Sequence, residues 1–413
     1  MNLNKGKIIN RCDKIILFSL YAIAYFLPIS KAIIESLSII AIVFFIFKKI
    51  IQRQGIPFTH LNFGIFAYLA VCFFSICFSS NLKISSITFF CKILQNLLFF
   101  FVVADTLNNE RRIKTVVYIL FISSLLLGID GIYQYFTHKD FIRHRVDLGI
   151  PRIYASFYTP NDFGCYLITV IPFLIVTFFT KGLKKLFKVA ISGLFILLFI
   201  CLILSVSRGA WLGFVASILF LGFWLRSVMV VFLIVVFLLL ALRSFFSPLI
   251  KDRLNNLFNF FDMDILTDGG SIERRIIWRT GWRMFLSSPL IGVGLGTFMF
   301  NYKKFLSEDY PYGPFYAHNC YLQIAAETGT IGLFAFLLIL ILFFFFGIKV
   351  LNKRNNSKAF SWYVLLGSLA AILAYCVHMF VDTNLYSLDL GMLFWLVLGL
   401  GSAILRNTGA LDG

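Results

Sequence analysis

The sequence predicts an all-α integral membrane protein, and three observations carry that prediction. Of the 413 residues, 60% are hydrophobic and only 14% are charged, whereas a soluble domain carries roughly a quarter of charged residues. Apolar runs recur from Ile15 to Leu405, and many approach the ~20 residues that a helix needs to cross a bilayer. The ~10-residue alternating segments of a membrane β-barrel do not occur in the sequence.

About twelve transmembrane helices are expected. Their approximate ranges are 14–29, 31–47, 61–79, 84–104, 115–136, 162–180, 189–206, 211–225, 228–246, 322–347, 360–380 and 386–405. The first range follows the N-terminal residues without an A-x-A-like site, so no cleavable signal peptide is expected.

Positive charge is placed beside alternate ends of these ranges. The clusters are Lys5/Lys7/Arg11, Lys48/Lys49/Arg53, Arg111/Arg112/Lys114, Lys181/Lys184/Lys185/Lys188, Arg226, Lys349/Lys353/Arg354/Lys358 and Arg406. Cytoplasmic loops carry such an excess of Lys and Arg, so we expect a bacterial inner-membrane protein with both termini in the cytoplasm. The net charge of +18 then reflects topology and contacts with membrane lipids, and no nucleic-acid partner is expected.

The opposite, periplasmic side contains the longer connections. A medium loop covers 137–161 and a large loop covers 247–320, which divides the chain into spans one to nine (1–246), this large catalytic loop, and spans ten to twelve (321–413). The stretch 271–288 reads as a helix that starts at a polar cap and stops before Ser288-Pro289. An ordered loop is expected because a set of apolar residues can give it a core: Trp278, Trp282, Phe285, Leu290, Ile291, Phe298 and Phe300.

Arginine outnumbers lysine in the periplasmic loops and at the adjoining helix ends. The arginines are Arg143, Arg145, Arg152, Arg208, Arg274, Arg275, Arg279 and Arg283. Lysine suffices to set topology, whereas the planar guanidinium binds phosphate with two parallel hydrogen bonds. This side therefore predicts a phosphorylated partner, which in a membrane protein could be a lipid pyrophosphate.

Two arginine positions are candidates for function. Arg208 lies in the turn 205–211 at the outer end of the seventh span, where a charge is costly and marks a functional site by default; anchoring to headgroups beside Trp211 is the alternative. Arg275 and Arg279 share a helical face and would repel each other without an anion between them. Anchoring that helix to anionic headgroups explains the pair equally well.

His318 falls where the large loop returns to the membrane. Imidazole is the side chain best suited to accept a hydroxyl proton near neutral pH, although a histidine can also simply cap the start of a helix. Two other motifs are expected to be misleading. The run 292–296 (GVGLG) lacks a preceding strand and is interpreted as a packing turn. Asp262 and Asp264 resemble a metal-binding D-x-D pair but lie in a polar stretch, and no metal is expected there.

Several motifs together resemble the O-antigen ligase/polymerase superfamily of bacterial cell-envelope glycosyltransferases. They are Arg274-x-x-x-Trp278, the run 288–298 (SPLIGVGLGTF), His318-Asn319-x-Tyr321-Leu322-Gln323, Glu327-Thr328-Gly329-x-Ile331-Gly332, the turn 207–211 (SRGAW) and the segment 152–161 (RIYASFYTPN). They cover about residues 150–335, and the number of spans extends the likeness to the whole chain. The set is specific for the superfamily and much less specific among its members.

The resemblance implies an inverting glycosyl transfer, without metal or cofactor, from an undecaprenyl-pyrophosphate-linked glycan to a sugar of the lipid A core. His318 matches the proposed base of the family and Arg208 its span-end arginine. The second loop arginine matches Arg274 or, one position on, Arg275. We expect Arg152 and Arg279 to assist in pyrophosphate binding, and Asn319 and Trp278 to support the site. Should His318 be structural, the base would be sought among Glu327, Tyr316 and Glu308.

Three other functions stay open. An O-antigen polymerase or a protein O-oligosaccharyltransferase would share the motifs, because both belong to the same superfamily. A transporter would place ionisable groups near the midplane of the membrane, and the candidates for that role are Glu35, Lys92, Asp130, His378 and Arg243. No internal repeat supports transport.

Overall fold

The computed structural model describes residues 2–146, 152–227, 269–306, 313, 315–353 and 359–407. This part of the chain is helical, and its strand-like pairing is limited to one isolated bridge between Lys139 and Val146. The predicted all-α class is therefore confirmed. The expected ninth span, with Arg243, and the residues Asp262, Asp264 and Glu308 lie outside the described residues.

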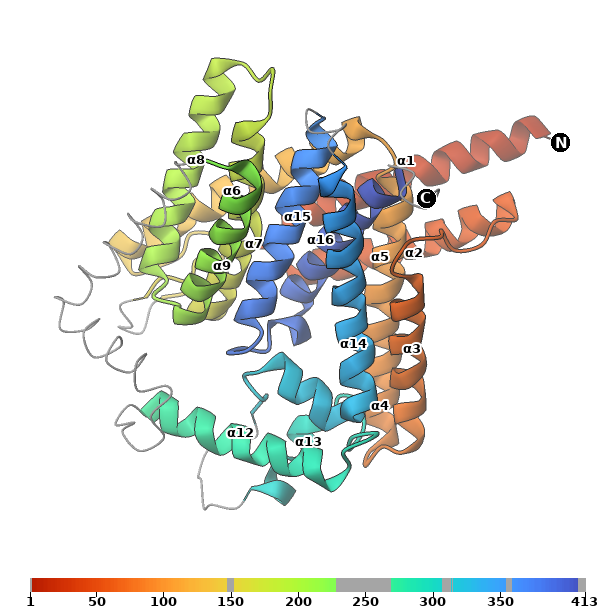
Figure 1. The fold of residues 1–413 in the computed structure, drawn as a ribbon, viewed down its shortest axis with the longest axis vertical. Helices are drawn as coiled ribbons and strands as arrows, with labels where there is room; N and C mark the ends of the chain where they lie inside the picture. Colours follow the sequence, from red (N-terminus) through yellow and green to blue (C-terminus); the bar gives the residue numbers. More distant parts are fainter. Residues whose placement is uncertain are drawn as a thin grey trace.

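The helices follow one another in the order shown in Figure 1. Their bounds are α1 Asn2–Phe26, α2 Lys31–Gln52, α3 Asn62–Cys77, α4 Leu82–Thr88, the π-helix η1 Phe89–Ile93, α5 Leu94–Thr106, α6 Glu110–Thr137, α7 Pro160–Phe179, α8 Lys185–Leu204, α9 Arg208–Leu225, α12 Gly269–Ser287, α13 Phe298–Phe305, α14 Cys320–Asn352, α15 Phe360–His378, the 3-10 helix η3 Asn384–Tyr386 and α16 Leu388–Asn407.

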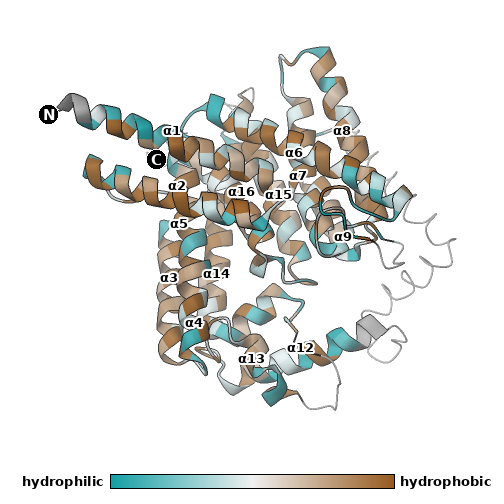
Figure 2. Ribbon diagram, turned by 180° about the vertical axis from the view of Figure 1, so that it is seen from behind, coloured by the Kyte–Doolittle hydropathy of each residue, from teal (hydrophilic) through white to brown (hydrophobic). Residues whose placement is uncertain are grey.

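Eight helical segments of the described chain are long and apolar enough to cross a membrane, which makes this a multi-pass membrane protein. They are the α4–η1–α5 segment, α6, α7, α8, α9, α14, α15 and α16. The first three expected spans correspond to α1, α2 and the shorter α3, which fall outside this set. The apolar colour of the outer helices in Figure 2 matches exposed side chains such as Ile39 and Val43 on α2 and Phe63 and Phe74 on α3, where lipid can cover them.

The centre of the bundle is formed by α7, α15 and α16, whose residues are mostly buried. Helix α15 packs against α7, α9 and α16, and α16 packs against α5. The α7–α8 connection lies at one end of the bundle, and α12 and α13 lie across the opposite end (Figure 1). The end with the α7–α8 connection is therefore the lysine-rich end. The end with α12 and α13 is the one that the sequence predicts to be periplasmic.

Helix α12 confirms the helix expected over 271–288, but the expected loop core is wrong in part. Of the apolar residues proposed for it, Phe298 is buried, whereas Trp282 and Leu290 are 54% and 63% exposed. The buried cluster is instead formed by Ile277, Met284, Phe298, Tyr302, Ala317 and Ala326. The loop therefore packs both on itself and on Ala326 of α14, and hydropathy alone does not show which of its apolar residues are buried.

The glycine-rich run 292–296 is a packing turn, as expected. Its backbone bonds to α14 at a break in that helix, where Gly329 has φ 68°: the Val293 N–H donates to the Ala326 carbonyl and the Gly294 N–H donates to that of Glu327 (2.9 and 3.0 Å). A Cβ on Gly329 would lie 2.1 Å from the Leu290 carbonyl group. Only glycine permits both the positive φ and this approach.

The side chain of Glu327 fixes the same turn. Its carboxylate accepts hydrogen bonds from the Gly296 N–H (2.9 Å), the Gln323 amide (3.1 Å) and the Tyr386 hydroxyl (3.2 Å). The residue is 1% exposed. These contacts give the Glu327 side chain a structural role, because they hold the glycine-rich turn in place.

Candidate functional site

The connection between α6 and α7 carries the first site arginine and is tied to the helix ends by polar contacts. The Gln134 side-chain oxygen accepts the N–H groups of Tyr154 and Ala155, both at 2.8 Å. Arg145 donates to the Phe157 carbonyl, and Arg143 donates to the Ile29 carbonyl (3.2 Å). Two of the arginines that suggested a phosphorylated partner therefore hold the loop in place.

Three arginines meet in a cavity of about 50 Å³, which we call the arginine cavity. Arg152 comes from the α6–α7 connection, Arg208 from the start of α9 and Arg274 from α12. The cavity is also lined by Asn161, Val206, Ser207, Gly209, His378 and Val381. The sequence analysis expected all three arginines to bind the pyrophosphate, and the structure brings them together in this cavity.

Two hydrogen bonds of Arg152 go to neutral groups. Its Nε donates to the Ser205 carbonyl (2.9 Å), and its Nη2 donates to the Asn161 side-chain oxygen (3.1 Å). The Ser207 hydroxyl donates to the same Asn161 oxygen at 3.0 Å. No carboxylate occurs among the described residues that line the cavity, whose charged lining residues are arginines.

The turn before α9 presents the start of that helix to the cavity. Ser207 is the residue before the helix, and Val206 adopts φ 48°, which is rare for a β-branched residue and occurs mainly at functional sites. The first N–H groups of a helix have no partner within it and favour anions. Gly209 allows the start of α9 to lie close to Val381, because a Cβ at this position would be 2.3 Å from the Val381 side chain.

Helix α12 brings only one of its predicted arginines to the cavity. Arg274 lines it, whereas Arg275 does not, and Arg279 is exposed. Trp278, expected to support the site, is half-buried on the same helix. Of these two adjacent arginines, the structure places Arg274 and not Arg275 at the arginine cavity.

A second cavity of about 510 Å³, the histidine cavity, adjoins the first. Its walls include His318, Tyr316, Asp162 and Asp382, together with Lys31 of α2, Lys92 of the π-helix η1, and Gln95 and Asn96 of α5. Asn161 lines both cavities. Groups in the two cavities can therefore act on one ligand that occupies both.

His318 lies in the histidine cavity beside a carboxylate that the sequence analysis missed. Its Nδ1 is 3.4 Å from Oδ1 of Asp382, and its side chain is 36% exposed. Asp382 is held there because the start of α14 binds the same loop: Cys320 donates through its N–H to the Met379 carbonyl and through its thiol to the Asp382 carbonyl. Neither the spacing nor the hydropathy of the sequence indicates this pairing.

Burial alone would raise the pKa of Asp382, but the hydrogen bond with His318, the nearby charges of His378 and His318 and the Thr383 N–H together lower it to about 2. The carboxylate therefore stays ionised and suits an Nδ1–H donor on His318, which leaves Nε2 as the basic nitrogen. Asn319 has a simpler use, because its side chain caps α14 by accepting the Leu322 N–H at 3.0 Å.

Comparison with known proteins agrees with the motifs. Residues 193–337 match the family model described as O-antigen ligase. The resemblance to the O-antigen ligase/polymerase superfamily is confirmed. The matched range contains Arg208, Arg274 and His318, while Arg152, His378 and Asp382 lie outside it.

Two curated relatives each match most of this chain. A Rickettsia conorii protein is 24% identical over 336 residues, which is 78% of this chain and 76% of that protein. A Rickettsia typhi protein is 24% identical over 318 residues, or 73% of each chain. Both are named “putative polysaccharide ligase”.

Proposed function

We propose that the chain is an O-antigen ligase, an inverting and metal-independent glycosyltransferase. It would transfer a glycan from undecaprenyl pyrophosphate to a sugar of the lipid A core on the periplasmic face of the inner membrane. The observation that carries this proposal is the adjoining pair of cavities, one lined by three arginines and the other by His318 with Asp382.

The arginine cavity is suited to the pyrophosphate of the donor. Pyrophosphate leaves the anomeric carbon best when its developing negative charge is neutralised by groups already in place. Arg152, Arg208 and Arg274 supply that charge, and the start of α9 adds N–H donors. Arg275 and Arg279 are not at this cavity; they remain candidates for contacts with anionic headgroups or with a more distant part of the donor.

His318 is suited to activate the acceptor. With Nδ1–H directed to Asp382, the Nε2 atom takes the proton of the acceptor hydroxyl as the hydroxyl oxygen forms its bond to the anomeric carbon. The bond from that carbon to the pyrophosphate oxygen breaks in the same displacement, and its electron pair leaves with the pyrophosphate. A single displacement of this kind inverts the anomeric centre.

The location of the site supports the periplasmic assignment. Residues of the α7–α8 connection line neither cavity, and α12, which brings Arg274 to the arginine cavity, lies at the opposite end of the bundle from that connection (Figure 1). Lipid-linked glycans and lipid A core would reach such a site from the outer leaflet of the inner membrane.

The test is transfer by the purified protein, with lipid-linked glycan and lipid A core as substrates. We expect transfer that persists in excess EDTA and that is lost in His318→Ala while donor binding is kept. Activity restored only by Mg²⁺ or Mn²⁺ would contradict the metal-free mechanism.

A polymerase is the second candidate, because the superfamily contains both activities and the same cavities could accept another lipid-linked repeat. Deleting the gene distinguishes the two. Loss of a ligase leaves lipopolysaccharide without its long-chain ladder while lipid-linked polymer accumulates, whereas loss of a polymerase leaves a single repeat attached to the core.

A further inference from the structure

A second histidine belongs to the arginine cavity. His378 is the last residue of α15, is 1% exposed and lines the cavity together with the three arginines. The sequence analysis considered it only as a buried ionisable group of a transporter. Its position instead places an imidazole against the start of α9: a Cβ on Gly209 would lie 3.5 Å from His378 Nε2.

The hydrogen bonds around His378 determine which ring nitrogen carries the proton. Nδ1 is 2.7 Å from the side-chain oxygen of Asn384, and the amide nitrogen of Asn384 donates to Asp162 at 3.0 Å. The amide nitrogen of Asn384 already donates to the Asp162 carboxylate. The Asn384 oxygen therefore faces His378 and accepts the hydrogen bond from it. Nδ1 is therefore the donor, and the lone pair of a neutral ring is on Nε2.

Nε2 is a buried polar atom without a hydrogen-bond partner among the described residues. Such atoms are rare in folded proteins, since burial removes water without replacing its hydrogen bonds. Here the atom belongs to a residue that lines a cavity built from arginines, amides and hydroxyls. A ligand oxygen in that cavity would give it a partner.

We propose that His378 is a ligand of the anionic group that occupies the arginine cavity, and that a proton lies between its Nε2 and a phosphate oxygen in the bound state. This inference rests on the proposed function, in which that group is a pyrophosphate. The donor would thus be bound by three guanidinium groups and an imidazole, and its binding would be coupled to the uptake of one proton.

The surrounding charges explain the coupling. Arg208 on α9, Arg274 on α12 and Arg152 share the cavity with His378, and Asp382 and the Asn384-bound Asp162 lie on its other side. A further positive charge beside three arginines is unfavourable while the cavity holds no anion. A bound pyrophosphate makes protonation of His378 favourable. A protonated Nε2 donates a hydrogen bond to a pyrophosphate oxygen, whereas the lone pair of a neutral Nε2 would repel that oxygen.

The experiment compares pyrophosphate binding by full-length wild type and His378→Gln in detergent. Titration calorimetry in buffers of different ionisation enthalpy, at mildly acidic and mildly alkaline pH, gives affinity and proton uptake together. We expect the variant to bind roughly tenfold more weakly at acidic pH, as for the loss of one charge-assisted hydrogen bond. The difference should shrink at alkaline pH, and proton uptake should be lower in the variant.

His138→Asn is the matched control, because His138 is an exposed residue that caps the end of α6 in a left-handed conformation that asparagine tolerates. It should bind like wild type. Should His378→Gln not fold, ¹⁵N NMR of the five histidines in wild type replaces it. One ring must then show a protonated Nε2 only when pyrophosphate is bound.

The outcomes separate this inference from the proposed function. Wild type that binds pyrophosphate, and an Arg208→Ala variant that does not, support the cavity as the anion site. Equal affinity and equal proton uptake in His378→Gln would then overturn the role of His378 alone. Wild type that fails to bind pyrophosphate would overturn the proposed anion site and this inference with it.

Discussion

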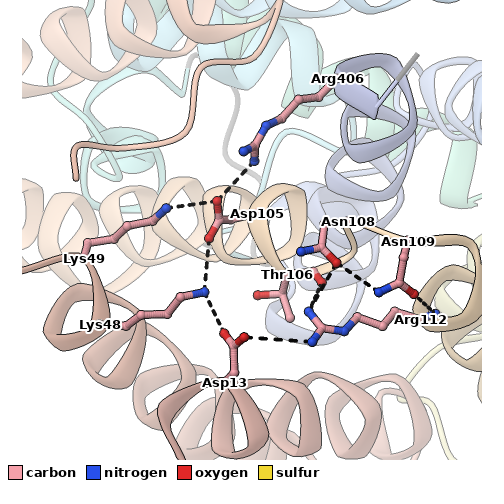
Figure 3. A network of polar contacts seen from close by, with 9 residues as sticks. All are labelled: Asp13, Lys48, Lys49, Asp105, Thr106, Asn108, Asn109, Arg112 and Arg406. Carbon is pink, nitrogen blue, oxygen red and sulfur yellow. Dashed lines mark hydrogen bonds and ion pairs between the residues drawn. The ribbon is translucent and has the colours of Figure 1, made fainter. Parts of the chain in front are cut away.

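The two ends of the helix bundle use positive charge in different ways. At the lysine-rich end, Asp105 lies 3.0 Å from Lys49, 3.6 Å from Lys48 and 3.1 Å from Arg406 (Figure 3). Asp13 adds contacts of 2.6 Å with Lys48 and 3.9 Å with Arg112, so that the network joins α1, α2, α5, α6 and α16. We call it the Asp105 network. Its cations are matched by carboxylates and hold helices together.

The lining of the arginine cavity is different. Arg152 donates to a carbonyl and to an amide oxygen, and the described residues that line the cavity include no Asp or Glu. A cation surrounded by neutral acceptors is fixed in position while its field remains available to a ligand. The comparison teaches that the number of positive residues does not distinguish a structural cluster from a binding site; the acceptors around them do.

Arg208→Ala should have the largest effect on turnover. Removing a contact to the departing pyrophosphate worth ~3 kcal/mol lowers the transfer rate by about a hundredfold. Arg208→Lys should restore little, because a point charge does not reproduce two parallel N–H donors. The measurement is transfer per folded protein with saturating acceptor.

The matched control is Arg283→Ala, an exposed arginine of α12 that lines neither cavity. Its transfer rate should equal that of wild type. Full rescue by Arg208→Lys would reduce Arg208 to a general source of positive charge, and the two ends of the molecule would then differ less than their geometry suggests.

Asp382→Asn should have the next largest effect, on the order of tenfold in kcat, because the amide keeps the shape but no longer stabilises the imidazolium of His318. Adding Asp382→Asn to His318→Ala should cost nothing further, since both act through one proton transfer. The pH–rate profiles of wild type and Asp382→Asn should also differ if the carboxylate takes part in the proton transfer. Additive losses and an unchanged profile would make Asp382 structural.

The lowered pKa of Asp382 also makes the stability of the fold depend on pH. Because its folded value of about 2 lies below its ordinary value, the carboxylate stabilises the fold at pH above ~3.9 and loses this effect only as the pH falls toward the folded value. At mildly acidic pH the protein should therefore still be folded, and a loss of transfer there should not come from protonation of Asp382. A circular-dichroism melt recorded at the same pH checks this.

Asp105→Asn should affect stability and leave transfer per folded protein unchanged. It would leave Lys48, Lys49 and Arg406 without the carboxylate they share. Breaking a fully buried ion pair costs ~3–5 kcal/mol; a smaller loss of roughly 1–3 kcal/mol is expected here, since Arg406 is 36% exposed and partly screened. The measurement is the midpoint of thermal unfolding in detergent. A loss of activity in correctly folded protein would show that the network communicates with the site.

Hydropathy was sufficient for much of the fold, because span position is a local property. The range 360–380 became α15 at Phe360–His378, and 271–288 became α12 at Gly269–Ser287. Hydropathy did not decide whether the first three spans cross the membrane. Helices form at these positions, but their charges or short length leave them outside the set that is long and apolar enough. The loop core was predicted incorrectly in part, because hydropathy does not show which apolar residues of α12 meet protein: Ile277 and Met284 are buried, whereas Trp282 and Leu286 are exposed.

The site shows the same limit. Arg208, Arg274 and His318 were expected from local motifs, and the structure places them around adjoining cavities. Asp382 and His378 were not assigned to the site, because their roles depend on the α15–α16 connection meeting the start of α14 and the start of α9. These contacts join residues far apart in the sequence, and no spacing within one segment encodes them.

Arg406→Ala should have the smallest effect and completes the comparison between the two ends. Arg406 contacts Asp105 at 3.1 Å from the rim of the Asp105 network, and Lys48 and Lys49 remain to compensate that carboxylate when the guanidinium is removed. An exposed ion pair contributes ~0–1 kcal/mol, so the unfolding midpoint should fall slightly and the transfer rate should not change. An arginine removed from one end would then cost almost nothing, whereas Arg208 removed from the other end should slow the reaction about a hundredfold. A drop in stability as large as that of Asp105→Asn would mean that Arg406, rather than the two lysines, holds Asp105 in place.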